Sequence, residues 1–469
     1  MEADMEKTDK MAVMPVKKLM LSMGIPMIIS MVLQAVYNIV DSAFVSNMAV
    51  GGEQALNALT LAFPMQILMV AVGIGTGVGA NVLTAKSLGS GNTEQASRTA
   101  GNAAFMSAVI YAAFLLFGLF GTDLYIGSQT TDPDAARMGS EYLRICCVFS
   151  FGMSFFAIYE KLLQAAGHSL YSTIAQIAGA VTNIVLDPIM IYGWLGLPEM
   201  GVKGAAYATV IGQIVSFALA FIFHLKVNRQ ITNKLKYLKP DLRIIGQMYS
   251  VGLPAIISQA LISVMTYGMN LVLGGIANEA VTAYGLYYKV MQFLLFAAFG
   301  MRDAIMPITA YSCGMGDRDR IRDSVKYGQL YTFIIMLAGT IALEVFAEPF
   351  AAVFGLSGVT NDLCVSAMRV ISLCFVFAGV NIAFQGVFQA LGSGVGSLIV
   401  SLCRQLIFVF PFAWLFAGMT GGIAENAWLV WITFPIAEIL TVAVAVFLHI
   451  RIMRTRVPEA APVGDRVNA

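Results

Sequence analysis

The chain has 469 residues, of which 58% are hydrophobic and only 12% are charged, and its mean hydropathy is +0.77. A soluble globular domain typically carries about 25% charged residues, so this composition excludes an ordinary soluble protein and indicates a polytopic membrane protein. The formal net charge is only +1. The basic residues are nevertheless distributed very unevenly along the chain.

Apolar segments long enough to cross a membrane recur along the whole chain. A helix needs about 20 residues to span the hydrocarbon core, and by this measure the sequence predicts an all-α fold of about twelve transmembrane helices. The apolar segment near the N-terminus lacks a cleavage pattern and is expected to be retained. The expected helices are 17–46, 55–86, 99–120, 140–166, 170–195, 201–225, 246–275, 280–311, 327–348, 364–391, 395–418 and 427–450.

The basic residues predict the orientation. Almost all Lys and Arg fall in segments on one side of the expected membrane, whereas the opposite loops hold only Arg137 and Lys203. The positive-inside rule therefore predicts a multi-pass protein of the plasma (cytoplasmic) membrane with both termini in the cytoplasm. We interpret the basic segment at 226–243 as a topology signal and a hinge between lobes, in preference to a site for lipid or nucleic acid.

The two halves of the chain are a duplication. "GIPMIIS" at Gly24 returns as "GLPAIIS" at Gly252, and "LLQAAG" ending at Gly167 returns as "VFQALG" ending at Gly392. Six helices in each repeat predict two lobes of the same orientation, which is transporter architecture with a cleft between lobes and alternating access. The expected parts are 1–225 for the N-terminal lobe, 226–245 for a cytoplasmic connector, 246–450 for the C-terminal lobe and 451–469 for a cytoplasmic tail.

Polar side chains share one face on three helices of the first half. Ionisable residues inside membrane helices are costly and usually functional, and such faces are expected to look inward at similar depth. The residues are Gln34, Tyr37, Asn38 and Asp41 on the first helix, Gln176, Asn183 and Asp187 on the fifth, and Thr209 and Gln213 on the sixth.

Asp41 and Asp187 are candidates for binding a coupling ion. Carboxylate, amide and hydroxyl oxygens suit a hard cation such as sodium, and two nearby carboxylates in a low dielectric can instead share a proton. Pro188 cannot donate a backbone hydrogen bond, which leaves the carbonyl of Ile184 available near Asp187. The alternative is that both aspartates are structural. In the second repeat, the positions equivalent to Asn183 and Asp187 hold Phe408 and Phe412, so this site was not duplicated.

The second half has its own polar and aromatic face, which suits a mostly apolar cleft for an organic ligand. Its candidate substrate residues are Gln259, Ser263, Tyr284, Tyr287, Tyr288, Gln292, Asn381 and Gln385. Five charges are candidates for gating or structural pairing: Lys289, Arg302, Asp303, Arg404 and Glu438. Arg302 and Asp303 are adjacent in sequence, so they are expected to face different ways and to need other partners. Glu160 and Lys161 are expected to reach the cytoplasmic side or to pair structurally.

Several segments together resemble the multidrug and toxic compound extrusion (MATE) family. They are "YNIVDSAFV", "SLGSGN", "LLQAAG", "TNIVLDPIMIY", "GVKGAAYATVIGQ" and "FQALG", in family order. The resemblance implies two six-helix lobes and export of organic, often cationic and amphipathic compounds in exchange for inward sodium or protons.

The resemblance also implies which residues couple transport to the ion. The first-lobe cation network of the family maps onto Tyr37, Asp41, Asn183, Asp187 and Thr209. Some branches carry acidic residues on the seventh and tenth helices, where this chain has Asn270 and Asn381. The chain therefore resembles the branch that couples through the first lobe.

Other functions were weighed beside the antiporter. A lipid-linked saccharide flippase of the same wider superfamily is the main alternative, followed by a channel, or a receptor or enzyme embedded in the membrane. No nucleophile with a base, metal motif or phosphate loop is present in the sequence, so we expect no enzyme and no cofactor beyond the coupling ion. Small organic substrates and the bilayer are the expected partners, and each chain is expected to function as a monomer.

Overall fold

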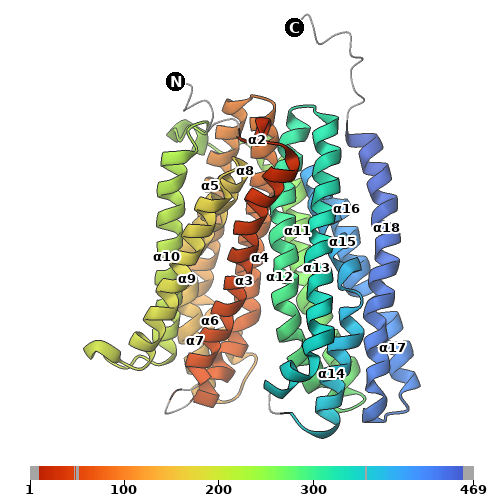
Figure 1. The fold of residues 1–469 in the computed structure, drawn as a ribbon. Helices are drawn as coiled ribbons and strands as arrows, with labels where there is room; N and C mark the ends of the chain where they lie inside the picture. The colour runs from red at the N-terminus through yellow and green to blue at the C-terminus, as the bar shows by residue number, and fades with distance from the viewer. Residues whose placement is uncertain (1–9, 47, 49–51, 354–355, 458–469) are drawn as a thin grey trace, which may run out of the picture. The chain divides into compact units, whose positions relative to one another are not determined.

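The structure is a computed structural model that describes residues 10–46, 48, 52–353 and 356–457, with the side chains of a few of these, including Asn38, outside the described part. Ten of its helices are long and apolar enough to cross a membrane, and two bent helix pairs raise the number of spans to twelve, within the described residues. The all-helical polytopic fold expected from the sequence is confirmed (Figure 1).

Contacts divide the chain into two compact units, Ile29–Ile256 and the combination of Met1–Ile28 with Ile257–Ala469. Both boundaries fall inside long helices, α3 (Val16–Ser46) and α11 (Leu242–Gly274). The beginning of α3 therefore belongs with the second half of the sequence, and the beginning of α11 with the first. These units differ from the expected lobes at 1–225 and 246–450, which remain a prediction about how the chain moves.

The unit Ile29–Ile256 is built from helices that pack along their lengths. Small residues line its core, with Ala55, Ala62, Ala205 and Ala206 completely buried. Its elements after α3 are α4 (Gly52–Gly89), α5 (Thr93–Phe120), α6 (Thr122–Gly127), α7 (Pro133–Val148), α8 (Phe151–Ala165), α9 (Ser169–Ile191), η1 (Trp194–Gly196), α10 (Val202–Val227) and η2 (Leu235–Leu238).

The other unit has an aromatic core, in which Tyr284, Tyr287 and Trp431 are buried. Beside the short α2 (Lys10–Val13) and the later part of α11, its elements are α12 (Asn278–Gly314), α13 (Arg318–Val353), α14 (Gly358–Ser372), α15 (Phe375–Ala390), α16 (Gly394–Leu402), the π-helix η3 (Cys403–Ile407), α17 (Val409–Met419), η4 (Ala424–Ile432) and α18 (Thr433–Arg456).

Two helices predicted to be continuous are bent. The segment expected at 140–166 consists of α7 and α8, which meet at 48°, and the one at 364–391 consists of α14 and α15, which meet at 53°. No proline lies at either break. Instead, a hydroxyl from another helix donates a hydrogen bond to a backbone carbonyl beside each break. Tyr111 donates to the carbonyl of Val148 at 3.2 Å, and Thr340 to that of Ser372 at 2.9 Å. Side chains that satisfy freed carbonyls in this way stabilise a kink.

The same local geometry appears in both repeats. Gly91 and Gly316 have φ of 73° and 70°, values that favour glycine, and each lies in the turn that ends a long helix. An ion pair joins Arg144 to Asp123 in the first repeat, and Arg369 to Glu348 in the second, 225 positions later in both members. The duplication read from the sequence therefore extends to turns, bends and ion pairs.

The connector between the repeats is packed against α5 rather than hanging free as a simple hinge. The backbone N–H of Thr232 donates to Ser97 Oγ at 2.8 Å, and that of Asp241 donates to Asn102 Oδ1 at 2.7 Å. Between these bonds, the backbone of Tyr237 lies directly on Gly101, where an added Cβ would collide with it. The absence of a side chain at Gly101 thus allows η2 to dock.

Candidate functional site

Two helices of the first repeat approach closely enough to fix their side chains against each other. Gly179 of α9 faces Gly212 of α10, and a Cβ added to Gly212 would lie 2.6 Å from the carbonyl oxygen of Gly179 and 3.1 Å from Cβ of Asn183. Such backbone approach is typical of membrane helices with small residues at their interface. This seam places Asn183 and Thr209 beside each other.

Asn183, Asp187 and Thr209 form a buried polar cluster. Asp187 is completely buried, and the other two are nearly so. With the Asn183 amide turned to satisfy both neighbours, its nitrogen donates to Asp187 Oδ2 at 3.2 Å and its oxygen accepts from the backbone N–H of Thr209 at 3.1 Å. This orientation is favoured because a carboxylate accepts hydrogen bonds and a backbone N–H donates one.

Helix α3 brings the second carboxylate to this cluster. The side chain of Asp41 lies within hydrogen-bonding range of Asp187, and that of Tyr37 within range of Thr209. Tyr192, just beyond α9, donates from its hydroxyl to the carbonyl of Phe44 at 2.6 Å and ties the ends of the two helices together. Five residues far apart in sequence thus converge as the polar faces predicted.

The remaining polar residues of these faces form a second layer along α3 and α9. Gln176 donates to Gln34 Oε1 at 3.1 Å and accepts from the hydroxyl of Ser30. The side chain of Asn38 lies outside the described part of the structure, and Gln213 is half-buried on α10. Gln34 and Gln176 therefore join the two helices about two to three turns from the carboxylate pair.

The cluster has the chemistry of a site for a hard cation or a proton. Asp41 Oδ1 is buried and accepts no hydrogen bond from the described residues, although a buried carboxylate oxygen ordinarily has a partner. The Pro188 ring also leaves the carbonyl of Ile184 without its usual helical donor. Carboxylate, amide and hydroxyl oxygens at one place suit sodium, and two adjacent carboxylates suit a shared proton.

The candidate substrate residues of the second repeat divide into buried and accessible ones. Tyr284, Tyr287, Asn381 and Gln385 are buried, whereas Gln259, Tyr288 and Gln292 are half-buried and Ser263 is exposed. The Tyr284 ring is stacked on Trp431 at 6.0 Å between centroids, and the Gln385 amide donates to Ser401 Oγ at 3.0 Å. Most of the polar and aromatic face predicted on α12 and α15 is therefore packed inside its own unit.

Two of the unexplained charges are partners of each other, contrary to the expectation that they face different ways. Arg302 Nη2 lies 2.9 Å from Asp303 Oδ1, and the guanidinium also lies over the Phe299 ring at 4.9 Å. The long arginine side chain can fold back along the helix, so adjacent residues meet despite their diverging Cβ directions. The expectation that each needed some other partner was wrong for Arg302.

Arg404 and Glu438 form a second buried ion pair. Arg404 of the π-helix η3 reaches Glu438 of α18 with Nη2–Oε1 at 2.7 Å and Nε–Oε2 at 3.0 Å. The Asn381 amide donates to the same carboxylate at 2.7 Å. Lys289, in contrast, is exposed and makes no ion pair with the described residues.

A family model decides the identity of the fold. The MatE model matches residues 26–189 and again residues 254–415, which together are well over half of the chain. The chain belongs to the MatE family. Two matches in one chain also agree with the duplication, and MATE proteins are ion-coupled transporters rather than enzymes.

Curated relatives of this MATE chain are similar along nearly its entire length. It is 24% identical over 437 residues to a multidrug export protein MepA of Staphylococcus saprophyticus, covering 93% of this chain and 94% of the relative. The MepA protein of a Staphylococcus aureus strain is also 24% identical, with 94% of this chain and 95% of the relative covered. The similarity therefore extends over nearly the whole of this chain and of each relative.

Solved structures share the fold. One, described as the outward-facing conformation of a multidrug resistance MATE family transporter of the MOP superfamily, has a TM-score of 0.87 at 25% identity, covering 96% of this chain and 99% of that one. A MOP superfamily transporter from Pyrococcus furiosus, whose binding pocket is described as having reverse polarity, has a TM-score of 0.87 at 26% identity and covers 95% and 98%.

Three residues near the MATE carboxylate pair escaped the sequence analysis. Gln66 of α4 donates to the Tyr142 hydroxyl at 3.0 Å and approaches the Cys146 sulfur at 3.9 Å. Tyr142 and Cys146 of α7 in turn lie close to Tyr37 and Asp41. The only signals in the sequence were the i, i+4 spacing of Tyr142 and Cys146 and a glutamine within an apolar stretch of another helix, which by themselves predict packing.

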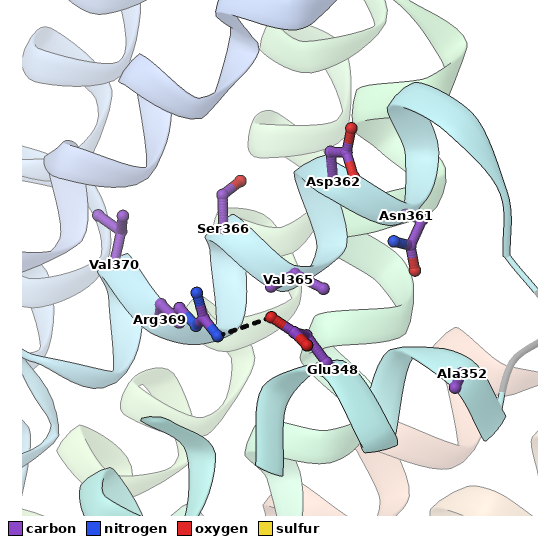
Figure 2. A pocket seen from close by; sticks show the side chains of 8 residues that line it. All are labelled: Glu348, Ala352, Asn361, Asp362, Val365, Ser366, Arg369 and Val370. Atoms are coloured by element: carbon purple, nitrogen blue, oxygen red, sulfur yellow. Dashed lines mark hydrogen bonds and ion pairs between the residues drawn. The ribbon is translucent and has the colours of Figure 1, made fainter. Parts of the chain in front are cut away.

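A cavity of about 620 Å³ lies elsewhere in this MATE chain, between the end of α13 and the start of α14. Figure 2 shows Arg369 of α14 reaching Glu348 of α13 across it, a bond of 3.0 Å. Because the first repeat contains the equivalent pair of Arg144 and Asp123, this ion pair is part of the duplicated scaffold. None of the residues lining the cavity belongs to the carboxylate site, which lies on α3, α9 and α10. The carboxylate site has no counterpart in the second repeat.

Proposed function

We propose that this MATE chain is a multidrug efflux antiporter that exports organic, often cationic amphipathic compounds in exchange for inward sodium or protons by alternating access. The observation that carries the proposal is the convergence of Asp41 and Asp187 with Tyr37, Asn183 and Thr209 inside one compact unit. The relatives named as multidrug export proteins supply the substrate class.

The coupling ion is proposed to bind at the carboxylate pair of the first repeat. Asp187 accepts a hydrogen bond from Asn183, whereas Asp41 Oδ1 has no donor among the side chains that the structure describes, so an incoming cation or proton would complete the site. Occupancy of the site would disfavour the drug-binding state, and the reciprocity of linked binding means that drug would equally disfavour the ion. In the second repeat Phe408 and Phe412 stand at the positions equivalent to Asn183 and Asp187, which supports coupling through the first repeat alone.

The orientation and the assembly are also proposals. The uneven distribution of Lys and Arg supports both termini and the connector on the cytoplasmic side of the plasma membrane. We propose that the halves 1–225 and 246–450 act as the two moving lobes. Because both family matches lie in one chain, a monomer would contain the complete transport machinery.

Dye efflux from proteoliposomes tests the proposal, with sodium and proton gradients imposed separately. Asp41→Asn and Asp187→Asn are expected to reduce gradient-driven efflux at least tenfold, because a neutral amide cannot exchange a proton or neutralise a cation. Thr182→Ala is the matched control, since the Thr182 hydroxyl bonds only to the carbonyl of Ala178 in its own helix at 2.7 Å.

Two outcomes would reject the proposal. Full coupled efflux in both aspartate variants would show that the ion binds elsewhere. A wild-type protein that moves no cationic dye under either gradient, but does translocate a lipid-linked saccharide, would instead establish the flippase function. Dependence on a single gradient would identify the coupling ion.

A further inference from the structure

The connector between α10 and α11 exposes large apolar side chains beside basic ones. Leu235 and Leu242 are 85% and 84% exposed, and Leu238 is 40% exposed. Exposed leucines scattered singly are ordinary, but three within eight positions, two in the connector and Leu242 at the start of α11, form a patch that marks an interaction site. The basic residues of the patch are Lys234, Lys236, Lys239 and Arg243, all exposed.

The charge of this patch is not neutralised by the protein itself. None of its four basic side chains forms an ion pair with a described residue. The nearest acidic side chain in the connector, Asp241, accepts hydrogen bonds from the backbone N–H groups of Arg243 at 2.9 Å and Ile244 at 3.4 Å, and so caps the start of α11. The patch is therefore both apolar and cationic, which is the composition of a membrane-surface element.

The patch is held at a defined level along α5. It docks on α5 at Gly101, which lies eight residues, or about 12 Å, from the first residue of that helix, Thr93. A helix of 28 residues is about 42 Å long, whereas the hydrocarbon core is about 30 Å thick, so α5 extends into the headgroup layer. The bonds of Thr232 and Asp241 to α5 keep η2 at this level.

Although the sequence alone favoured a topology signal here over a lipid site, we propose that a surface of the connector and the first turn of α11 binds anionic lipids of the adjacent leaflet. Its residues are Lys234, Leu235, Lys236, Leu238, Lys239, Leu242 and Arg243. The leucines would insert among the acyl chains near the headgroups, while the basic groups contact lipid phosphates. This surface is separate from the carboxylate site, and only its assignment to the cytoplasmic leaflet rests on the proposed orientation.

Native mass spectrometry of the full chain in detergent, titrated with phosphatidylglycerol or phosphatidylcholine, tests the proposal without any transport. A triple variant, Lys234→Gln, Lys236→Gln and Lys239→Gln, is expected to weaken binding of phosphatidylglycerol at least fivefold and to leave binding of phosphatidylcholine unchanged. The control variant removes three other exposed charges, Lys326→Gln, Arg451→Gln and Arg454→Gln. It is expected to change the binding of phosphatidylglycerol less than twofold. Equal losses in both variants, or no loss, would overturn the proposal.

A nitroxide label gives an independent measure of depth. In nanodiscs with one quarter phosphatidylglycerol, a label on Leu235→Cys in a Cys313→Ser background is expected to collide more often with oxygen than with a water-soluble nickel chelate. A label on Glu199→Cys, in an exposed loop, is the water-accessible control. A chelate-accessible label at position 235 would show that the patch faces water and serves a soluble partner, and the lipid proposal would fall.

Discussion

At the scale of single residues, hydrogen bonding distinguishes the two carboxylates of the candidate site. Asp187 accepts a hydrogen bond from the Asn183 amide nitrogen, and the backbone N–H of Thr209 donates one to the amide oxygen. Asp41 Oδ1 has no donor among the described residues. An unfilled acceptor in a membrane interior is costly, so the site gains stability when a cation or proton fills it.

Removing one neutral oxygen is expected to weaken ion binding without abolishing it. Thr209→Val keeps the shape of the side chain but loses the hydroxyl that lies beside Tyr37 and 3.4 Å from the Asn183 amide. A single hydrogen bond contributes about 0.5–1.5 kcal/mol, so the half-saturating ion concentration for efflux is expected to rise about two- to tenfold. Thr182→Val, at a residue whose hydroxyl bonds within its own helix, should leave the half-saturating ion concentration unaltered.

The buried ion pair of Arg404 and Glu438 is expected to affect the stability of the fold, because each charge neutralises the other. Arg404→Met or Glu438→Leu alone leaves one unpaired buried charge, which typically costs about 3–5 kcal/mol. The double variant removes both charges and should recover most of the lost stability. Thermal unfolding of the purified protein in detergent checks this order. Single variants that unfold at the wild-type temperature would mean that the pair is solvated.

At the scale of elements, the seam between α9 and α10 positions the site. Glycine on both helices lets the backbones approach, and Asn183 lies one turn from Gly179 on the same helix face. Polar residues that are correctly spaced along each helix meet only because this seam sets the helix separation.

Widening the seam is therefore expected to impair transport as well as stability. Gly212→Ala places a Cβ 2.6 Å from the Gly179 carbonyl oxygen and forces the helices apart, an overpacking that costs about 1–3 kcal/mol. Coupled efflux should fall together with the unfolding temperature. Gly285→Ala, in α12 with no atom within 4 Å of the added Cβ, should keep wild-type efflux and unfold no earlier. Normal ion coupling in Gly212→Ala would show that the helix separation is not critical.

At the scale of the whole molecule, duplication preserved the scaffold but not the site. Turn glycines, helix bends and the Arg–acid pairs recur at the repeat offset in both halves. The carboxylate cluster does not, because Phe412 stands at the position equivalent to Asp187. The proposed coupling site is therefore expected in only one of two similar halves.

The distribution of basic residues makes a prediction for the whole chain. Cysteine introduced at Lys239 in the connector should react with an impermeant maleimide only in inverted vesicles, and cysteine at Leu195 only in intact cells. Both positions are exposed, and of the native cysteines all but the half-buried Cys313 are buried, so Cys313→Ser gives a low background. Labelling of both sites from the same side would contradict the predicted topology.

The sequence by itself determined the membrane class, the spans, the duplication and the polar faces. These follow from local rules, since a helix must hide its polar side chains from lipid and its residues share a face at fixed spacing. Tyr37, Asp41, Asn183, Asp187 and Thr209 could therefore be found without a structure.

Only the tertiary structure decided which residues meet across helices. The structure places Gln66, Tyr142 and Cys146 near the carboxylates. It also pairs Arg404 with Glu438, which lies 34 positions later in the sequence. It also decided that the connector docks on α5 and that two predicted spans bend. Such contacts depend on helix separation and rotation, which are set by packing over many residues and not by the spacing within any one helix.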